Sequence, residues 1–146
     1  MITLAVVSLL TSLAPCLVAD EKSPAERLAA DWLYPGAKVI HSGQGGAVSC
    51  VVQETADDVP KNLKHYANKL GIELRAGTAI QTGGRSTGGE TVEYAHSGRK
   101  PGAADGTVTV STFKTKSAVT TLVNFRPRDG KVSTITITQV PLGMAK

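Results

Sequence analysis

The C-terminal part of the chain alternates apolar and polar residues with the period of two that a half-buried β-strand requires. In residues 132–140, Ile135 and Ile137 share one side and the threonines around them share the other. The isoleucines are therefore expected to face a core and the threonines to face solvent. Asp129 and Gly130 separate this segment from the β-branched run before it, which predicts a hairpin whose turn needs positive φ angles.

Other segments rich in β-branched residues precede this hairpin. The predicted strands are residues 37–42, 47–55, 91–97, 107–113, 119–125 and 132–140, with weaker signals at 72–75 and 78–81. The stretch 83–89 contains four glycines and is expected to be a loop, because glycine weakens strands and favours turns.

Two helices are predicted between and before these strands. Ser23 and Glu26 have the spacing of a capping box, and this short helix must end by the Pro-Gly pair at residues 35–36. The second helix is expected to begin at Asp57, whose carboxylate can accept backbone amides of the first turn, and to end at Gly71. Its apolar residues recur at helical spacing and form one stripe: Val59, Leu63, Tyr66 and Leu70.

The pattern as a whole predicts an α+β fold. We expect an antiparallel sheet of four to six strands, one main helix packed on one face of it, and a short N-terminal helix. The predicted organisation is a signal peptide at 1–19, an N-terminal helix and linker at 20–36, and a single α+β domain at 37–146.

The first nineteen residues contain no charged side chain and have the apolar length of an export signal. Small or apolar residues at Leu17 and Ala19 predict cleavage after Ala19, which would leave an exported protein in the periplasm or outside the cell. Residues 13–16, which end at Cys16, also resemble a lipobox, so a lipid-anchored form through Cys16 is one alternative. An uncleaved membrane anchor is the other.

Composition and charge narrow the function further. Aromatic residues make up only 4% of the chain, which leaves few platforms for sugars or bases. Residues 20–97 hold eight basic and ten acidic side chains, a net charge of −2, whereas residues 98–146 hold eight basic and two acidic, a net charge of +6. The basic half predicts contact with an anionic surface. The candidate anion-binding residues are Arg126, Arg128 and Lys131.

No cofactor-binding, catalytic or specific nucleic-acid-binding motif is present in the sequence. Cys50 shares strand parity with Val48 and Val52 and is expected to be a small buried apolar residue. If their strands were neighbours, His41 and His96 could approach Cys50 and form a zinc site or activate the thiol.

The run Tyr34-Pro35-Gly36-Ala37-Lys38, followed by a helix of the form Thr-x-Asp-Asp-x-x-x-x-Leu-x-x-Tyr-x-x-x-Leu-Gly at residues 55–71, resembles a group of small exported bacterial domains of unknown function. The resemblance covers residues 34–140. It implies an envelope or secreted setting and a compact α+β fold, and it implies no activity.

Three functions are consistent with these observations. The first is an exported, non-enzymatic binding or scaffolding module with an envelope partner. The second is a small hydrolase or thiol-dependent enzyme that uses Cys50 and a histidine. The third is binding of an anionic surface through the basic C-terminal half.

Overall fold

The computed structural model describes residues 21–74, 80–87, 90–99 and 106–143, so the predicted signal peptide and Cys16 lie outside the described residues. Within those ranges the chain forms seven strands and two helices. The strands are β1 (Lys38–Gly45), β2 (Val48–Thr55), β3 (Gln81–Thr87), β4 (Glu90–Arg99), β5 (Thr107–Lys114), β6 (Ala118–Arg126) and β7 (Ser133–Pro141). The helices are α1 (Pro24–Trp32) and α2 (Val59–Leu70).

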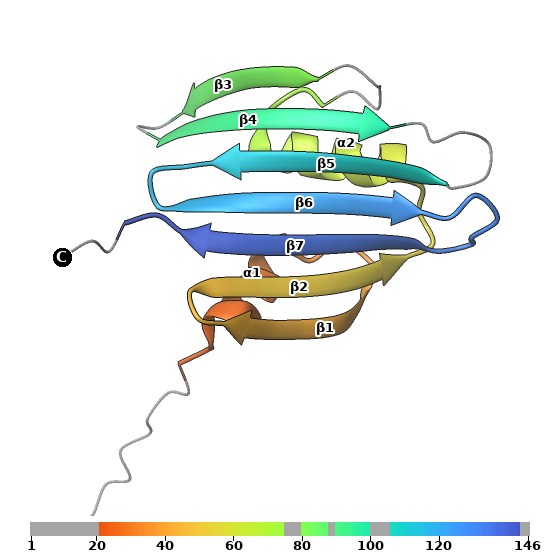
Figure 1. The fold of residues 1–146 in the computed structure, drawn as a ribbon, viewed down its shortest axis with the longest axis horizontal. Coiled ribbons are helices and arrows are strands. Elements are labelled where there is room, and N and C mark those ends of the chain that lie inside the picture. The colour runs from red at the N-terminus through yellow and green to blue at the C-terminus, as the bar shows by residue number, and fades with distance from the viewer. Residues whose placement is uncertain (1–20, 75–79, 88–89, 100–105, 144–146) are drawn as a thin grey trace, which may run out of the picture.

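All seven strands belong to one antiparallel sheet with the order β1-β2-β7-β6-β5-β4-β3 (Figure 1). Strand β7 lies between β2 and β6, so the end of the chain joins the first two strands to the remaining four. Both helices lie on the same face of the sheet, where α1 contacts β1 and β2 and α2 contacts β5 and β6 (Figure 1). The opposite face carries no helix among the described residues.

The predicted fold class was wrong in two respects. The sheet has seven strands instead of four to six, and two short helices of nine and twelve residues share one face in place of one main helix with a subsidiary one. The fold is therefore mostly sheet, although it remains of the α+β type.

The extra strand is β3, which occupies much of the stretch predicted as a loop. It pairs with β4 along its whole length, and Gly83 lies opposite Tyr94. A Cβ atom on Gly83 would lie 2.6 Å from the Tyr94 hydroxyl oxygen, so the tyrosine ring covers the place that a side chain would fill. Pairing with β4 and cover by this ring compensate for the poor strand propensity of glycine.

The predicted hairpin forms between β6 and β7, but its turn differs from the prediction. Phe125 pairs with Thr134, and the Gly130 amide donates to the Pro127 carbonyl at 3.1 Å. Neither Asp129 nor Gly130 has a positive φ angle. A longer turn that begins at a proline therefore replaces the tight Asp-Gly turn.

The helix ends follow local sequence signals with one correction. The capping box of α1 is confirmed, because the Ser23 Oγ accepts from the Glu26 amide and the Glu26 carboxylate accepts from the Ser23 amide. In α2 the N-cap is Asp58, whose Oδ1 accepts from the Lys61 amide at 2.9 Å, and the prediction of Asp57 was off by one residue. Gly71, with φ +63°, ends the helix as predicted.

The core lies between the helices and the sheet. The Trp32 ring stacks on Tyr66 of α2 and on Phe113 of β5, with centroid distances of 5.8 and 5.9 Å. Ile135 and Ile137 are fully buried beneath these rings, as their alternation predicted. The aromatic residues are few, and three of them join α1, α2 and the sheet.

Candidate functional site

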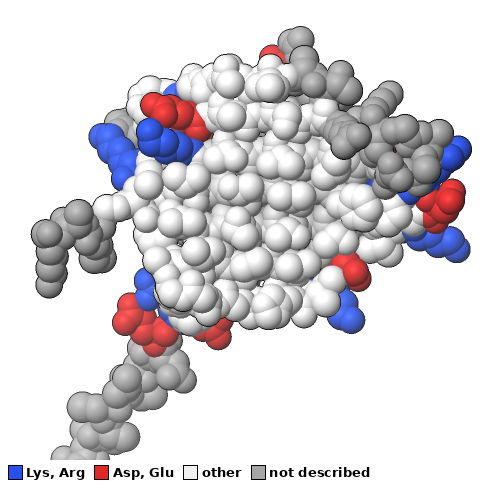
Figure 2. Space-filling view, viewed as in Figure 1, with Lys and Arg blue, Asp and Glu red and all other residues white. Residues whose placement is uncertain are grey.

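The candidate site is the face of the sheet opposite the helices. Its five central strands, from β2 to β4, present valine, threonine and other small or apolar side chains in register. The residues of this neutral face are Val48, Cys50, Val52, Ala95, Ser97, Val108, Val110, Thr112, Val119, Thr121, Val123, Phe125, Thr134, Thr136, Thr138 and Val140. None of them is charged, and Figure 2 shows the centre of this face free of charged side chains.

Strand alternation and register build the neutral face. Along the strands its residues alternate with buried ones, as Thr136 does with Ile135 and Ile137. Register then sets the exposed residues side by side in rows that cross the sheet. One row runs through Thr112, Thr121, Thr138 and Cys50, so that three hydroxyls follow one another across β5, β6 and β7.

Valine and phenylalanine dominate the rest of the face. In the next row Val110, Val123, Thr136 and Val52 are neighbours. Val110 is 38% exposed and Phe125 is 39% exposed, which is high for large apolar side chains. The neutral face therefore combines exposed apolar area with hydroxyl groups that both donate and accept hydrogen bonds.

Charged residues lie around the border of the neutral face (Figure 2). At one corner Lys38 and Glu54 are register partners on β1 and β2. At the diagonally opposite corner Lys114 on β5 donates to Glu93 on β4 at 3.3 Å. Each of these two corners therefore holds charges of both signs.

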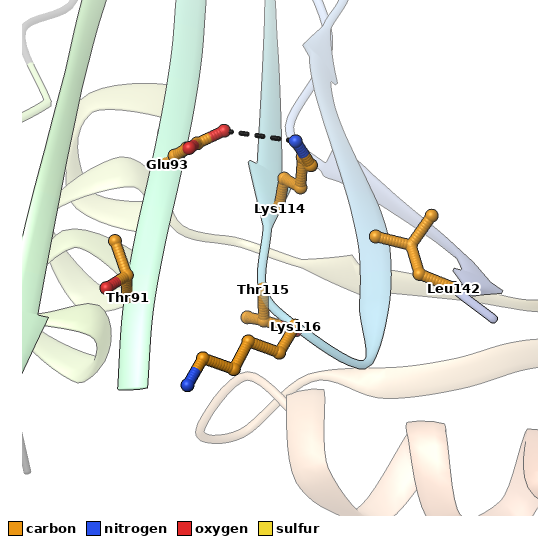
Figure 3. Close-up of a pocket in the computed structure, with 6 residues that line it drawn as sticks. All are labelled: Thr91, Glu93, Lys114, Thr115, Lys116 and Leu142. Carbon is orange, nitrogen blue, oxygen red and sulfur yellow. Dashed lines mark hydrogen bonds and ion pairs between the residues drawn. The ribbon is translucent and has the colours of Figure 1, made fainter. Parts of the chain in front are cut away.

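A hollow of about 260 Å³ lies beside the second corner. Figure 3 shows the Glu93–Lys114 pair on one side of it and Leu142 on the other. The remaining lining residues are Thr91, Thr115 and Lys116. Its size is below that of most small-molecule sites, and its polar groups are held on strand ends and a turn at the rim. The hollow is therefore best described as part of the border of the neutral face.

The structure separates the residues that were considered for a thiol or zinc site. Cys50 does share its face with Val48 and Val52, but this is the neutral face, so the prediction that Cys50 is buried in the core was wrong. His96 lies on the helix face, 1% exposed, and its Nδ1 is 2.7 Å from the Ser111 Oγ. The proposed cluster of two histidines and Cys50 therefore does not form.

His41 does lie near Cys50. Its register partner is Val52 on the neutral face, and a Cβ atom on Gly43, the register partner of Cys50, would lie 3.0 Å from the His41 Nε2. Within the described ranges no three histidine, cysteine or acidic side chains gather as metal ligands do. An enzymatic use of Cys50 with His41 stays a prediction.

The candidate anion-binding residues lie at the β6–β7 end of the sheet. The Arg126 guanidinium donates to the Ala56 carbonyl at 2.9 Å and to the Ser133 Oγ at 3.4 Å, so it links the start of β7 to the segment before α2. Arg128 and Lys131 are exposed in the turn on either side of Asp129. Part of the Arg126 donor capacity is thus used within the fold, and the anion site stays a prediction.

A hydrogen-bonded network ties the α1–β1 connection to the start of α2. The buried Tyr34 hydroxyl donates to the Asp57 Oδ2 at 2.7 Å, and the Lys61 Nζ donates to the Asp57 Oδ1 at 2.7 Å. The hydrogen bond from Lys61, followed by that from Tyr34, lowers the pKa of Asp57. Burial, followed by the bond to Asp57, raises the pKa of Tyr34 to about 12.

We expect this network to weaken in alkaline solution. The ordinary pKa of tyrosine is about 10, so the contribution of Tyr34 to stability is complete below that pH and is lost as the pH rises towards the folded-state pKa of about 12. The difference in Tm between the wild-type protein and Tyr34→Phe, measured by circular dichroism, should narrow between these two pH values. A difference that stays constant over that range would contradict the assignment.

The sequence contained an unused signal for the neutral face. The solvent-side positions of the predicted strands 119–125 and 132–140 are valine, threonine or phenylalanine, where a solvated sheet commonly places lysine and glutamate. Strand alternation predicts that this side faces solvent, and its lack of charge is the further signal that marks the neutral face.

Comparisons with known proteins found no match: no family model, no curated protein and no solved structure is similar to this chain. Neither described helix is long and apolar enough to cross a membrane.

Proposed function

We propose that this protein is an exported, non-enzymatic binding module and that the neutral face is its binding surface. The observation that carries the proposal is the absence of charge over the centre of an exposed seven-stranded sheet. Charged residues make up 19% of the chain, yet those beside this face lie at its border. A broad exposed surface with much apolar area is typical of a site that another molecule covers.

The chemistry of the neutral face favours binding over catalysis. Its polar groups are mainly threonine hydroxyls spread in rows on rigid strands, whereas a catalytic site brings a nucleophile and a base together in a cleft. The export part of the proposal rests on the uncharged apolar pattern of residues 1–19.

Cys50 provides a natural reporter for the proposed binding surface because it lies in the neutral face and is only half-buried. We expect maleimide to alkylate Cys50 several-fold more slowly in a fresh extract of the source cells than in purified protein, because a bound partner excludes the reagent. The rate is read by mass spectrometry of the peptide that contains Cys50. A dilution series of the purified protein supplies the unprotected reference rate.

The control is Cys50→Ser, which shows whether any labelling arises at Cys16 instead. Equal alkylation rates in the extract and in the most dilute purified sample would overturn the proposed function, since the neutral face would then be uncovered in its own setting.

A further inference from the structure

We propose that the partner is a second copy of this chain, packed face to face through the neutral face so that two seven-stranded sheets form a sandwich. This inference rests on the proposed function and names its partner. Two sheets that pack in this way lie about 10 Å apart and interdigitate their facing side chains. The helices would then cover the two outer faces of the assembly.

The neutral face is complementary to itself. A two-fold symmetric interface brings one surface patch against the same patch of the second copy. A patch with charge of one sign would therefore be repelled by its own copy, whereas an uncharged patch is not repelled. Threonine hydroxyls donate and accept hydrogen bonds, so the row of Thr112, Thr121 and Thr138 can pair with threonines of the second copy. A hydrocarbon surface would leave these hydroxyls unpaired, which makes lipid the poorer partner.

The charged corners fit the same arrangement. A two-fold axis that runs along a diagonal of the sheet, in the plane between the two copies, sets each of these corners either against its own copy or against the opposite corner. The corners are Lys38 with Glu54 and Glu93 with Lys114, and each holds both signs. Both arrangements can therefore bring a lysine of one copy against a glutamate of the other, and charge pairs at the rim favour the correct register.

The whole sheet face, with the neutral face at its centre and the charged residues at its border, has the area that a stable dimer needs. Seven strands at a spacing of about 4.8 Å, with about seven residues each at about 3.4 Å, give a sheet face of about 800 Å², of which the five strands of the neutral face supply about 570 Å². Each partner in an interface of standard size buries about 800 Å². The valines and Phe125 at the centre supply the apolar core that such interfaces contain.

Sedimentation velocity over a wide range of concentrations tests the dimer. The protein is expressed as the full chain, and its intact mass identifies the N-terminus of the product. The wild-type protein should show a monomer–dimer equilibrium. Val123→Arg should weaken the dimer by at least about tenfold, because two guanidinium groups would be buried without partners. Thr136→Lys is a second variant at the centre, and circular dichroism confirms that both fold.

The matched control is Val39→Arg. Val39 is 39% exposed, and its register partner Gln53 is buried on the helix side of the sheet, so this position on β1 faces away from the neutral face and the variant should dimerise as the wild-type protein does. Dimers that persist unchanged in both Val123→Arg and Thr136→Lys would overturn the inference.

The remaining outcomes separate this inference from the proposed function. A wild-type protein that is monomeric at every concentration, while Cys50 is still protected in the cell extract, would overturn the dimer and leave the binding module with a different partner. A monomer that sediments with phosphatidylcholine vesicles would overturn the dimer in favour of a lipid surface. Equal alkylation rates of Cys50 in the cell extract and in purified protein at every concentration would overturn both proposals.

Discussion

Replacing Trp32 with alanine is expected to lower the free energy of unfolding by about 3–5 kcal/mol. Trp32 is 9% exposed, and its ring stacks on Tyr66 of α2 and on Phe113 of β5. Its removal would leave a cavity at the point where α1, α2 and the sheet meet, and the surrounding rings can fill it only in part. Urea denaturation followed by circular dichroism measures the change.

The control is Leu33→Ala at the next position. Leu33 is 47% exposed, so its truncation should change the free energy of unfolding by less than about 0.5 kcal/mol. If both variants lost the same small amount of stability, α1 would not be docked on the sheet through Trp32. Trp32 lies on the helix face, away from the neutral face. The variant molecules that remain folded should therefore keep the neutral face and still dimerise through it.

Several features that depend on a few neighbouring residues were predicted correctly from the sequence. The capping box of Ser23 and Glu26 forms as predicted because its hydrogen bonds span only three residues. The burial of Ile135 and Ile137 followed from strand alternation, and the left-handed Gly71 followed from the end of the helical stripe.

The errors on Cys50 and on β3 share one physical cause, which is that local patterns leave tertiary choices open. Alternation placed Cys50 with Val48 and Val52, but the other side of β2 is the buried one, because Val51 and Gln53 contact the helix layer there. Residues 48–52 contain three valines, which lie on both sides of the strand. The apolar pattern therefore did not show which side would be buried. Strand β3 was missed because its stability comes from pairing with β4 and from the cover of Tyr94.

The neutral face could be predicted only in part for the same reason. Its threonines were assigned to solvent correctly, but their assembly into one surface depends on the insertion of β7 between β2 and β6. That insertion makes Thr138 the neighbour of both Cys50 and Thr121, which are far from each other in sequence. Pairings of such high sequence separation leave no local signal.

Gln53→Met is expected to lower the free energy of unfolding by about 2–4 kcal/mol although it keeps the size of the side chain. Gln53 is fully buried, its Oε1 accepts from the Tyr34 amide at 2.8 Å, and its Nε2 donates to the Trp32 carbonyl at 2.8 Å. Methionine would leave the Tyr34 amide buried without a partner. It would also remove one of the two side-chain hydrogen bonds that the Trp32 carbonyl accepts. Urea denaturation again gives the free energy.

Tyr66→Phe separates this explanation from a general loss of polar bonding in the core. The Tyr66 hydroxyl donates to the same Trp32 carbonyl at 3.0 Å, but its removal leaves Gln53 in place and orphans no backbone group. We expect Tyr66→Phe to cost only about 0.5–1.5 kcal/mol. An equal cost for the two variants would mean that the Tyr34 amide finds another partner, and that the link between β2 and the segment after α1 does not depend on Gln53.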